Sequence, residues 1–237
     1  MLDQINDKQV LFLDIETVPQ LYSFEETTDK IKYLWEKKAK YFINKEKKEE
    51  AKDVWQRAGI YAEFGKIICI SVGFIADKQI RLKSFFGDNE KKLLLEFILL
   101  LETAYNKSNN FLCAHNGKEF DYPYIARRML INNIKVPKIL DLAGKKPWEV
   151  QHLDTLELWK FGDYKHFTSL ELLTEIFNIP TPKDDIDGSQ VAKVYYEEKD
   201  IDRIVKYCEK DVVAVVQLYL RYKNKDIISP ENIISVN

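Results

Sequence analysis

Hydrophobic and polar positions along this chain follow strand-like patterns in some segments and helix-like patterns in others. Uninterrupted apolar runs at residues 10–13 and 111–114 are typical of short, buried central strands. Residues 66–75 and 79–86 predict two further strands, joined by a tight Ala-Asp-Lys turn. Pro19 blocks a regular continuation of the first strand.

Apolar residues at three- and four-residue steps predict helices in the other segments. Residues 27–56 are rich in Lys and Glu, and their apolar positions predict two amphipathic helices whose charges form a solvated face. The helix that follows the third strand is capped by Asp88 or Asn89. The remaining predicted helices comprise residues 90–105, 120–131, 168–177, 189–198 and 202–222.

The order of these elements favours an α/β fold with a mixed sheet flanked by helices. A first strand, a helical insertion and two strands precede an alternation of helix, strand and helices. No internal repeat or low-complexity linker interrupts the chain, so we expect one domain over residues 1–237 with a helical insertion around 27–57. A functional site is expected at the carboxyl end of the first strand.

Composition limits the class of protein further. Hydrophobic residues make up 46% of the chain, which excludes disorder of the whole chain. The net charge of −2 gives no global attraction to nucleic acid, so a polyanion would need a local basic patch or metal ions. The three cysteines show no Cys-x-x-Cys pairing or zinc-site spacing, and the chain lacks a signal peptide and a membrane-length apolar run. We therefore expect a reduced, cytoplasmic setting.

Two acidic residues, Asp14 and Glu16, follow the first apolar run directly. In a strand these two side chains project to the same face, while Ile15 points the other way into the core. Adjacent carboxylates in a poorly solvated place repel each other and raise at least one pKa, and a hard divalent cation such as Mg²⁺ or Mn²⁺ removes that cost. The alternative is a strand that simply ends at a solvated edge.

Two later stretches carry further acids on predicted elements. Asp121 precedes Pro123 at the start of a helix, where it is a catalytic residue, a helix cap, or both. Tyr207 and Asp211 are four residues apart and share one face of the last long helix. That face continues into core-like positions, so an acid on it needs a partner, which a metal ion would supply.

Taken together, the three stretches resemble a known family. Asp14, Glu16, Asp121 and Asp211, with Tyr207 four residues before the last acid, resemble the DEDD superfamily of 3′–5′ exonucleases in its tyrosine-bearing subclass. The stretches AGIYAEFGKIICIS and TPKDDIDGSQV resemble the predicted 3′–5′ exonucleases related to the proofreading domain of family B DNA polymerases. The resemblance spans most of the chain and implies a ribonuclease H-like fold.

The resemblance also implies a chemistry. The expected reaction is hydrolysis of phosphodiester bonds at the 3′ end of nucleic acid, with single-stranded DNA as the expected substrate and two ions of Mg²⁺ or Mn²⁺. Asp14 would bridge both ions. Glu16 and Asp211 would complete the shell of one ion, and Asp121 would reach the other. Tyr207 would position the attacking water, and a polymerase or repair factor is compatible with this role as a partner.

Further residues are candidate contacts to the substrate. By the same resemblance, Thr17 would contact the terminal nucleotide, and Val18 or Leu21 would wedge against the last base. Asn116 would hold the substrate backbone or the loop before the second acidic stretch. The candidate substrate-binding residues are Thr17, Val18, Asn116, Phe120 and Lys165.

One aromatic and basic cluster has two interpretations. It comprises Phe161, Tyr164, Lys165, His166 and Phe167. Such a mixture suits single-stranded nucleic acid, through base stacking and phosphate contacts. Aromatic packing beneath a loop explains the same residues.

Two polar pairs are also open between functional and structural roles. His152 and Asp154 either form a hydrogen-bonded pair on a loop near the site or stabilise the fold. Asp185 and Asp187 belong to a second metal site or to a surface turn, after which Ser189 caps the next helix.

Two other classes of protein compete with the exonuclease. Haloacid dehalogenase-like phosphatases also place acids after an apolar strand, in the pattern Asp-x-Asp-x-Thr. Here the second acid is Glu16 and Thr17 comes one residue too early for that pattern. The other alternative is a catalytically inactive nucleic-acid-binding module on the same fold, against which the presence of all four acids and the tyrosine argues.

Overall fold

The computed structural model describes residues 2–44, 46, 48–163, 165, 167–180 and 186–236. Six strands in these ranges form one mixed sheet in the order β5-β4-β1-β2-β3-β6. The β1–β2 and β2–β3 pairs are antiparallel, and the other three pairs are parallel. The strands are β1 (Val10–Pro19), β2 (Gly65–Ala76), β3 (Gln79–Phe86), β4 (Phe111–Ala114), β5 (Leu153–Asp154) and β6 (Ile233–Ser235).

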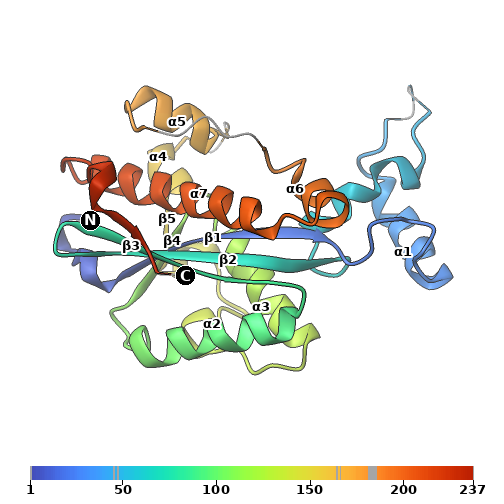
Figure 1. Ribbon diagram of the computed structural model, residues 1–237, viewed down its shortest axis with the longest axis horizontal. Helices are drawn as coiled ribbons and strands as arrows, with labels where there is room; N and C mark the ends of the chain where they lie inside the picture. Colours follow the sequence, from blue (N-terminus) through green and yellow to red (C-terminus); the bar gives the residue numbers. More distant parts are fainter. Residues whose placement is uncertain are drawn as a thin grey trace.

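Helices cover both faces of this sheet, which confirms the predicted α/β class (Figure 1). On one face lie α2 (Glu90–Ala104) and α3 (Asp121–Ile131). On the other lie α4 (Thr155–Lys160), α5 (Leu170–Ile176) and the long α7 (Ile201–Tyr222). The remaining helical segments are α1 (Asp29–Ala39), α6 (Val191–Lys193), the π-helical turn Val194–Glu198, and the 3₁₀ turns Leu2–Gln4, Asp7–Gln9, Ala51–Ile60, Lys138–Leu140, Pro147–Glu149 and Pro230–Asn232.

Alternation along β1 divides the core into two layers. Val10 and Phe12 pack in a cluster with residues of α7, whereas Leu11, Leu13 and Ile15 pack in a cluster with residues of α2 and α3. Successive side chains of a strand point to opposite faces, so the even-numbered acids that follow face α7. This confirms that Ile15 turns into the core, where its side chain is 5% exposed.

The apolar run at residues 10–13 suggested that the first strand ends before its acids, but the strand continues through them. β1 extends to Pro19 because β2 pairs with it along Phe12–Pro19, with a register shift between Glu16 and Thr17. The parallel pairing with β4 covers Val10 to Phe12 only. Both acids therefore lie on a strand that is supported on one edge by β2 and extends beyond the β4 pairing.

The local signals for turns and caps were confirmed in part. Asp77 and Lys78 both have positive φ, as the predicted tight hairpin turn requires. Asn89 caps α2, since its side chain accepts a hydrogen bond from Lys92 N. The predicted cap at Ser189 is wrong because Gln190 occupies the N-cap of α6.

Among the strands and α-helices of the described ranges, β5, α4 and β6 were not predicted. Each is six residues or fewer, and β5 has two. Elements this short carry no usable hydrophobic period, and their backbone is fixed by the neighbours to which they dock. The insertion was predicted as helical, and its second half is a 3₁₀ helix instead of an α-helix.

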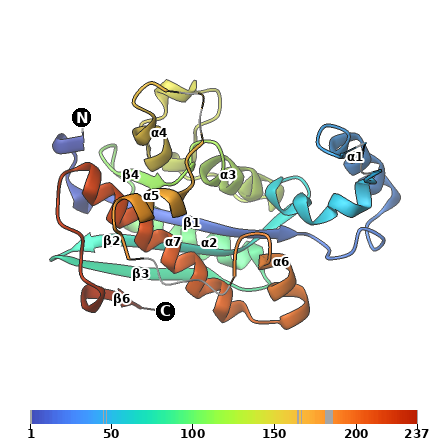
Figure 2. The same ribbon diagram turned by 90° about the horizontal axis from the view of Figure 1, so that it is seen from above.

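The insertion lies beyond the end of β1 (Figure 2). It has an aromatic core of its own. Trp35 is fully buried, and its ring meets that of Trp55 edge to face at 5.3 Å between centroids. The indole N–H of Trp55 donates to the carbonyl of Leu21, 2.9 Å away, just beyond β1. These contacts tie the insertion to the segment that leaves the strand carrying the acids.

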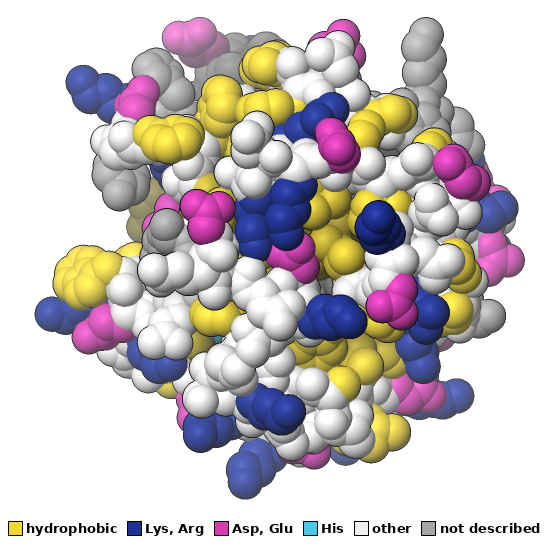
Figure 3. All heavy atoms as spheres, turned by 90° about the vertical axis from the view of Figure 1, so that its left-hand side faces the viewer, with side chains coloured by type: hydrophobic (Ala, Val, Ile, Leu, Met, Phe, Trp, Pro, Cys, Tyr) yellow, Lys and Arg dark blue, Asp and Glu magenta, His cyan; other side chains and the backbone are white. Residues whose placement is uncertain are grey.

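Charged and hydrophobic side chains are intermixed on the face drawn in Figure 3, where Lys and Arg side chains border hydrophobic surface. Several large hydrophobic side chains are well exposed: Tyr41, Leu99, Leu130, Trp148, Phe161 and Phe167. A net charge of −2 is therefore compatible with local surface that is both basic and apolar.

In the described part of the chain, no helix combines the length and the hydropathy needed to cross a membrane.

A buried ion pair fixes α3 to the sheet. Arg128 donates from Nε and Nη2 to the two carboxylate oxygens of Glu90, at 2.8 and 2.6 Å, and from Nη1 to the carbonyl of Ala62. The same Glu90 accepts the backbone N–H of Ile67 at 2.7 Å, beside the register shift of the β1–β2 pair. One pair therefore holds α2, α3 and the irregular part of β2 together.

We expect Glu90→Gln to lower the free energy of unfolding by about 3–5 kcal/mol, because it leaves the Arg128 charge buried and unpaired. Urea unfolding followed by circular dichroism measures the loss. Lys92→Met removes the exposed pair with Glu96 and is the matched control, with an expected change of less than about 1 kcal/mol. Equal losses in the two variants would show that the buried pair has no special role.

Candidate active site

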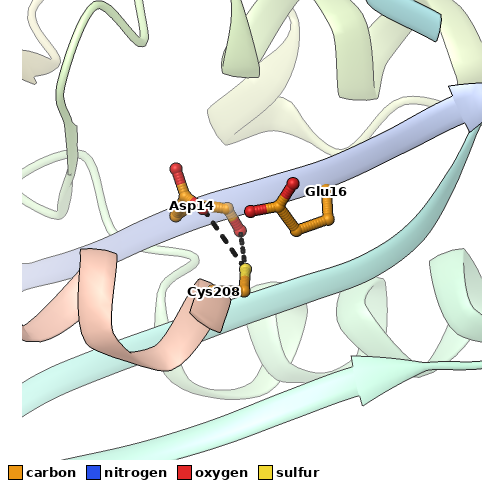
Figure 4. Close-up of side chains that lie close together, drawn as sticks. All are labelled: Asp14, Glu16 and Cys208. Carbon is orange, nitrogen blue, oxygen red and sulfur yellow. Dashed lines mark hydrogen bonds between the residues drawn. The ribbon is translucent and has the colours of Figure 1, made fainter. Parts of the chain in front are cut away.

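Asp14 and Glu16 lie side by side on the α7 face of β1, and Cys208 of α7 reaches toward them (Figure 4). The Cys208 Sγ is 3.3 Å from Asp14 Oδ2 and 3.4 Å from the Asp14 carbonyl oxygen. One ligand atom from each of the three residues lies within 4.8 Å of the others. Sequence analysis brought the two acids together correctly and missed the thiol.

Asp121 joins the same charged region from the opposite side. It is the first residue of α3, and Phe120 occupies the N-cap, so Asp121 is not the cap residue itself. Burial raises the pKa of Asp121 to about 8, although the backbone N–H groups of Asp121 and Ile15 act in the other direction. Since the β4 pairing covers β1 only as far as Phe12, the start of α3 occupies the space beside Ile15.

Asp211 reaches this region from α7, one turn beyond Cys208. Its charge is the strongest of the neighbouring charges that raise the pKa values of Asp14 and Glu16. Tyr207 lies four residues earlier on α7 and is half-buried against the cluster that holds Val18. The helical spacing that sequence analysis used for Tyr207 and Asp211 also places Cys208 three residues before Asp211, and this was the overlooked signal for the thiol.

The electrostatics of the site disfavour bare anions. Burial first, and then Asp211, Glu16 and Asp121, raise the pKa of Asp14 well above its ordinary value. Burial, followed by Asp211, Cys69 and Asp121, does the same for Glu16, whose side chain is 8% exposed. Carboxylates that repel one another in a poorly solvated region bind either protons or a cation.

The donor set fits a hard divalent cation. The Oδ1 atom of Asp121 is buried and has no hydrogen-bond partner in the described ranges. An orphaned buried oxygen is costly unless a ligand satisfies it. Carboxylate oxygens are the ligands that Mg²⁺ and Mn²⁺ prefer. Asp14, Glu16 and Asp121 therefore offer the carboxylate oxygens that such an ion prefers, and one of these oxygens has no hydrogen-bond partner in the described ranges.

Asp154 holds the loop that delivers Asp121. Its carboxylate accepts the backbone N–H groups of Asn116 and Lys118, at 2.9 and 3.0 Å, before α3. It also accepts those of Leu156 and Glu157 at the start of α4. Asn116 itself adopts a left-handed backbone conformation with φ of 62°, which asparagine tolerates better than most residues. Asp154 is thus structural support for the site.

Of the two interpretations of His152 and Asp154, the hydrogen-bonded pair is wrong, since the two side chains have different partners. His152 Nδ1 accepts the Leu112 N–H at 3.2 Å, and Nε2 lies 2.7 Å from the Ile139 carbonyl. The spacing of two residues between His152 and Asp154 did not bring their side chains into contact, because β5 ends at Asp154 and the chain turns into α4. The structural interpretation of His152 is the one that its contacts support.

The candidate substrate contacts differ in accessibility. Val18 has no exposed surface and packs among the residues of α6 and α7, so its side chain is not available as a wedge against a base. Leu21, the alternative, is 41% exposed. Thr17 on β1 and Asn116 in the loop before Asp121 are both half-buried. Phe120 packs partly against the main core.

The aromatic and basic cluster is open to solvent where the structure describes it. Phe161 is 91% exposed and Phe167 is 68% exposed, and Lys165 is also exposed. Packing beneath a loop is therefore wrong for these two phenylalanines. Tyr164 and His166 lie outside the described residues.

The Asp187 segment forms a turn. Asp187 is solvated, and its carboxylate accepts hydrogen bonds from the backbone N–H and the hydroxyl of Ser189. These contacts support the surface-turn interpretation. Asp185 lies outside the described residues.

A cavity of about 900 Å³ lies beside the Asp121 loop but not among the acids. Asn116, Tyr122 and Asp154 belong to its wall, and the rest comes mainly from the outer side of α3 and the segment that follows it. The chemistry-bearing cluster is instead the buried group on the α7 face of β1.

Comparison with known families decides the relationship of this chain. A family model described as a predicted 3′–5′ exonuclease related to the exonuclease domain of PolB matches residues 60–231. The chain belongs to this family. The match includes α3 with Asp121 and α7 with Asp211, and it confirms the resemblance to predicted 3′–5′ exonucleases related to family B DNA polymerases. Asp14 and Glu16 precede the matched residues.

Curated proteins similar to this chain include DNA polymerases. The chain is 22% identical over 143 residues to a DNA polymerase of Pyrococcus glycovorans and 21% identical over 142 residues to one of Desulfurococcus sp. (strain Tok). The matches cover 55% and 54% of this chain and 18% of each polymerase. The chain therefore corresponds to less than a fifth of those proteins.

The fold is shared with a solved polymerase structure. The family B DNA polymerase from the hyperthermophilic archaeon Pyrobaculum calidifontis matches 90% of this chain with a TM-score of 0.54 and 13% identity, over 24% of the polymerase chain. At that identity the likeness establishes the fold alone. It agrees with a ribonuclease H-like exonuclease domain, the architecture expected from the motifs.

The buried His152 should make stability fall below neutral pH. Burial lowers the pKa of His152 to about 4, whereas an unfolded histidine titrates near about 6.5. Between these values the unfolded chain binds the extra proton, so stability rises with pH through this window and is level above it. The free energy of unfolding should fall by about 3 kcal/mol between pH 7 and pH 4 as a result of this titration.

Urea unfolding at a series of pH values from 4 to 7.5 measures this dependence. His152→Gln keeps an amide acceptor for the Leu112 N–H and should show a flatter profile than the unaltered chain. Comparing the two profiles cancels the titration of the buried acids, which is common to both. Parallel profiles would show that folding does not lower the pKa of His152.

Proposed function

We propose that this chain is a divalent-metal-dependent 3′–5′ exonuclease that removes nucleotides from the 3′ end of nucleic acid, with single-stranded DNA as its first substrate. The observation that carries the proposal is the meeting of Asp14, Glu16, Asp121 and Asp211 from three distant segments at one buried place. Membership of a family of predicted 3′–5′ exonucleases supports the same activity.

The four carboxylates would hold the metal ions in this proposal. Asp14 is central, because the charges of the three other acids all raise its pKa. The charge of Asp211 also raises the pKa of Glu16, and Asp121 brings an oxygen that has no hydrogen-bond partner among the described residues. Mg²⁺ or Mn²⁺, when bound, supplies a hydroxide from water at neutral pH and stabilises charge on the phosphate oxygens.

Tyr207 would orient the attacking water. It lies one turn from Asp211 on α7, at the border between the acids and the apolar cluster of α6. A free tyrosine hydroxyl titrates near about 10, so at neutral pH it donates or accepts a hydrogen bond and does not act as a full base. Its contribution is the position of the nucleophile.

Exposed side chains of this chain suit an unpaired strand. Leu21 and Phe161 expose apolar surface, and Lys165 adds positive charge in the same segment as Phe161. Base stacking on exposed apolar and aromatic groups, with cations for phosphates, is how single strands are held without sequence preference. The relatives are polymerases, so we propose that a polymerase or repair complex supplies the substrate end.

Asp14→Ala and Asp211→Ala should each abolish hydrolysis and leave the fold intact, because removing one carboxylate opens the cation site and relieves repulsion. The assay uses oligonucleotides labelled at either end, as single-stranded DNA, RNA and mismatched duplex, with Mg²⁺ or Mn²⁺. Release of a labelled mononucleotide from the 3′-labelled strand is the expected product. A chelator should stop the reaction.

Asp202→Ala is the matched control, since Asp202 is an exposed acid on the same helix as Asp211. Full activity in either active-site variant would contradict the assignment. Binding of nucleic acid without hydrolysis by the unaltered chain would favour the inactive-module alternative.

Tyr207→Phe should lower the turnover rate by about 10²-fold or more, because it removes a hydroxyl that orients the nucleophile. Binding of Mn²⁺, measured by calorimetry, should stay unchanged. Tyr222→Phe is the control on α7, since that hydroxyl donates to the Thr155 carbonyl, away from the acids. Loss of Mn²⁺ binding in the Tyr207 variant would assign the tyrosine to the metal site itself.

A further inference from the structure

A thiol is part of the buried acidic group. Cys208 is fully buried on α7, and its Sγ contacts both the side chain and the carbonyl oxygen of Asp14. Figure 4 shows the sulfur directed at the carboxylate of Asp14, with Glu16 on the neighbouring position of β1. The atoms that these three residues offer lie within 4.8 Å of one another.

A second observation points to a ligand at this place. The Oδ1 atom of Asp121 is buried without a hydrogen-bond partner in the part of the chain that the structure describes, and Asp121 is 2% exposed. Its charge acts on both Asp14 and Glu16, so it lies near the same group. The sulfur is therefore set in a region that already has an unsatisfied oxygen.

Sulfur changes which cation this group prefers. Hard ions such as Mg²⁺ and Mn²⁺ take oxygen ligands, whereas thiolate selects softer ions such as Zn²⁺ and Cd²⁺. In a tetrahedral zinc site, metal–sulfur and metal–oxygen distances of about 2.3 and 2.1 Å place the two ligand atoms about 3.6 Å apart. Cys208 Sγ and Asp14 Oδ2 are separated by 3.3 Å, so they need to move little.

We propose that Cys208, Asp14 and Glu16 form a site for a thiophilic divalent cation of the Zn²⁺ or Cd²⁺ class, at the place where the carboxylates would hold Mg²⁺ or Mn²⁺. On binding, a metal–sulfur bond replaces the S–H bond of Cys208, and the proton leaves to solvent. No electron is transferred. Three protein ligands leave one tetrahedral position open, as in zinc sites that keep a water molecule.

The proposal deepens the proposed function only in that both classes of cation use the same two carboxylates. A thiophilic ion held by sulfur would exclude the hard ion from Asp14 and Glu16. Excess Mn²⁺ should therefore raise the concentration of Cd²⁺ needed to fill the site. Competition of this kind would make the chain sensitive to the balance of metal ions around it.

Cd²⁺ is the probe for the test, because bonding to a thiolate produces an ultraviolet charge-transfer absorption that carboxylates do not give. The reduced, metal-free chain is titrated with Cd²⁺ alone. We expect the absorption to saturate at a single equivalent and to be lost in Cys208→Ala and Cys208→Ser. Cys208→Ser preserves the size of the side chain and decides the matter if the alanine variant does not fold.

Cys113→Ala is the matched control. Cys113 of β4 is also a fully buried thiol, but it packs with Val10 and Phe12 of β1. This variant should keep the absorption of the unaltered chain. No absorption in the unaltered chain, or an undiminished one in Cys208→Ser, would overturn the proposal. The readout does not depend on hydrolysis, so an inactive chain that shows the absorption would refute the proposed function and leave this site standing.

Discussion

Repulsion among closely placed carboxylates is the constraint around which this structure is arranged. Asp14, Glu16, Asp121 and Asp211 come from β1, α3 and α7 and meet in a partly buried region, so each raises the cost of ionising its neighbours. Nothing in hydrophobic packing favours such an arrangement. In the proposed function, a cation shared by the four acids would convert this repulsion into attraction.

Several structural contacts hold the cage against that repulsion. The Glu90–Arg128 pair fixes α3 to α2, and Glu90 also binds the Ile67 N–H beside the register shift that follows Glu16. Asp154 gathers four backbone N–H groups and so shapes the loop before Asp121. These charged groups are fully engaged with donors, which separates them chemically from the orphaned oxygen of Asp121.

The thiol of Cys208 lies beside Asp14 and Glu16 and so belongs both to the packing of α7 and to the chemistry of the site. Cys208 belongs to the helix that also carries Tyr207 and Asp211, so the element that completes the acidic group also brings sulfur into it. A site with both oxygen and sulfur donors responds to the identity of the available metal, whereas a purely carboxylate site responds mainly to hard ions. Family membership leaves this feature open, because it follows from the contacts of one side chain.

Sequence alone determined the parts of this protein that depend on local periodicity. Alternation placed Asp14 and Glu16 on one face of β1, helical spacing paired Tyr207 with Asp211, and the order of elements predicted the mixed sheet. Tertiary structure decided what depends on distant partners. Pairing with β2 extended β1 through its acids, and packing buried Val18. Helical spacing placed Cys208 on the same side of α7 as Asp211, but its contact with Asp14, 194 positions away, depends on how α7 packs on β1.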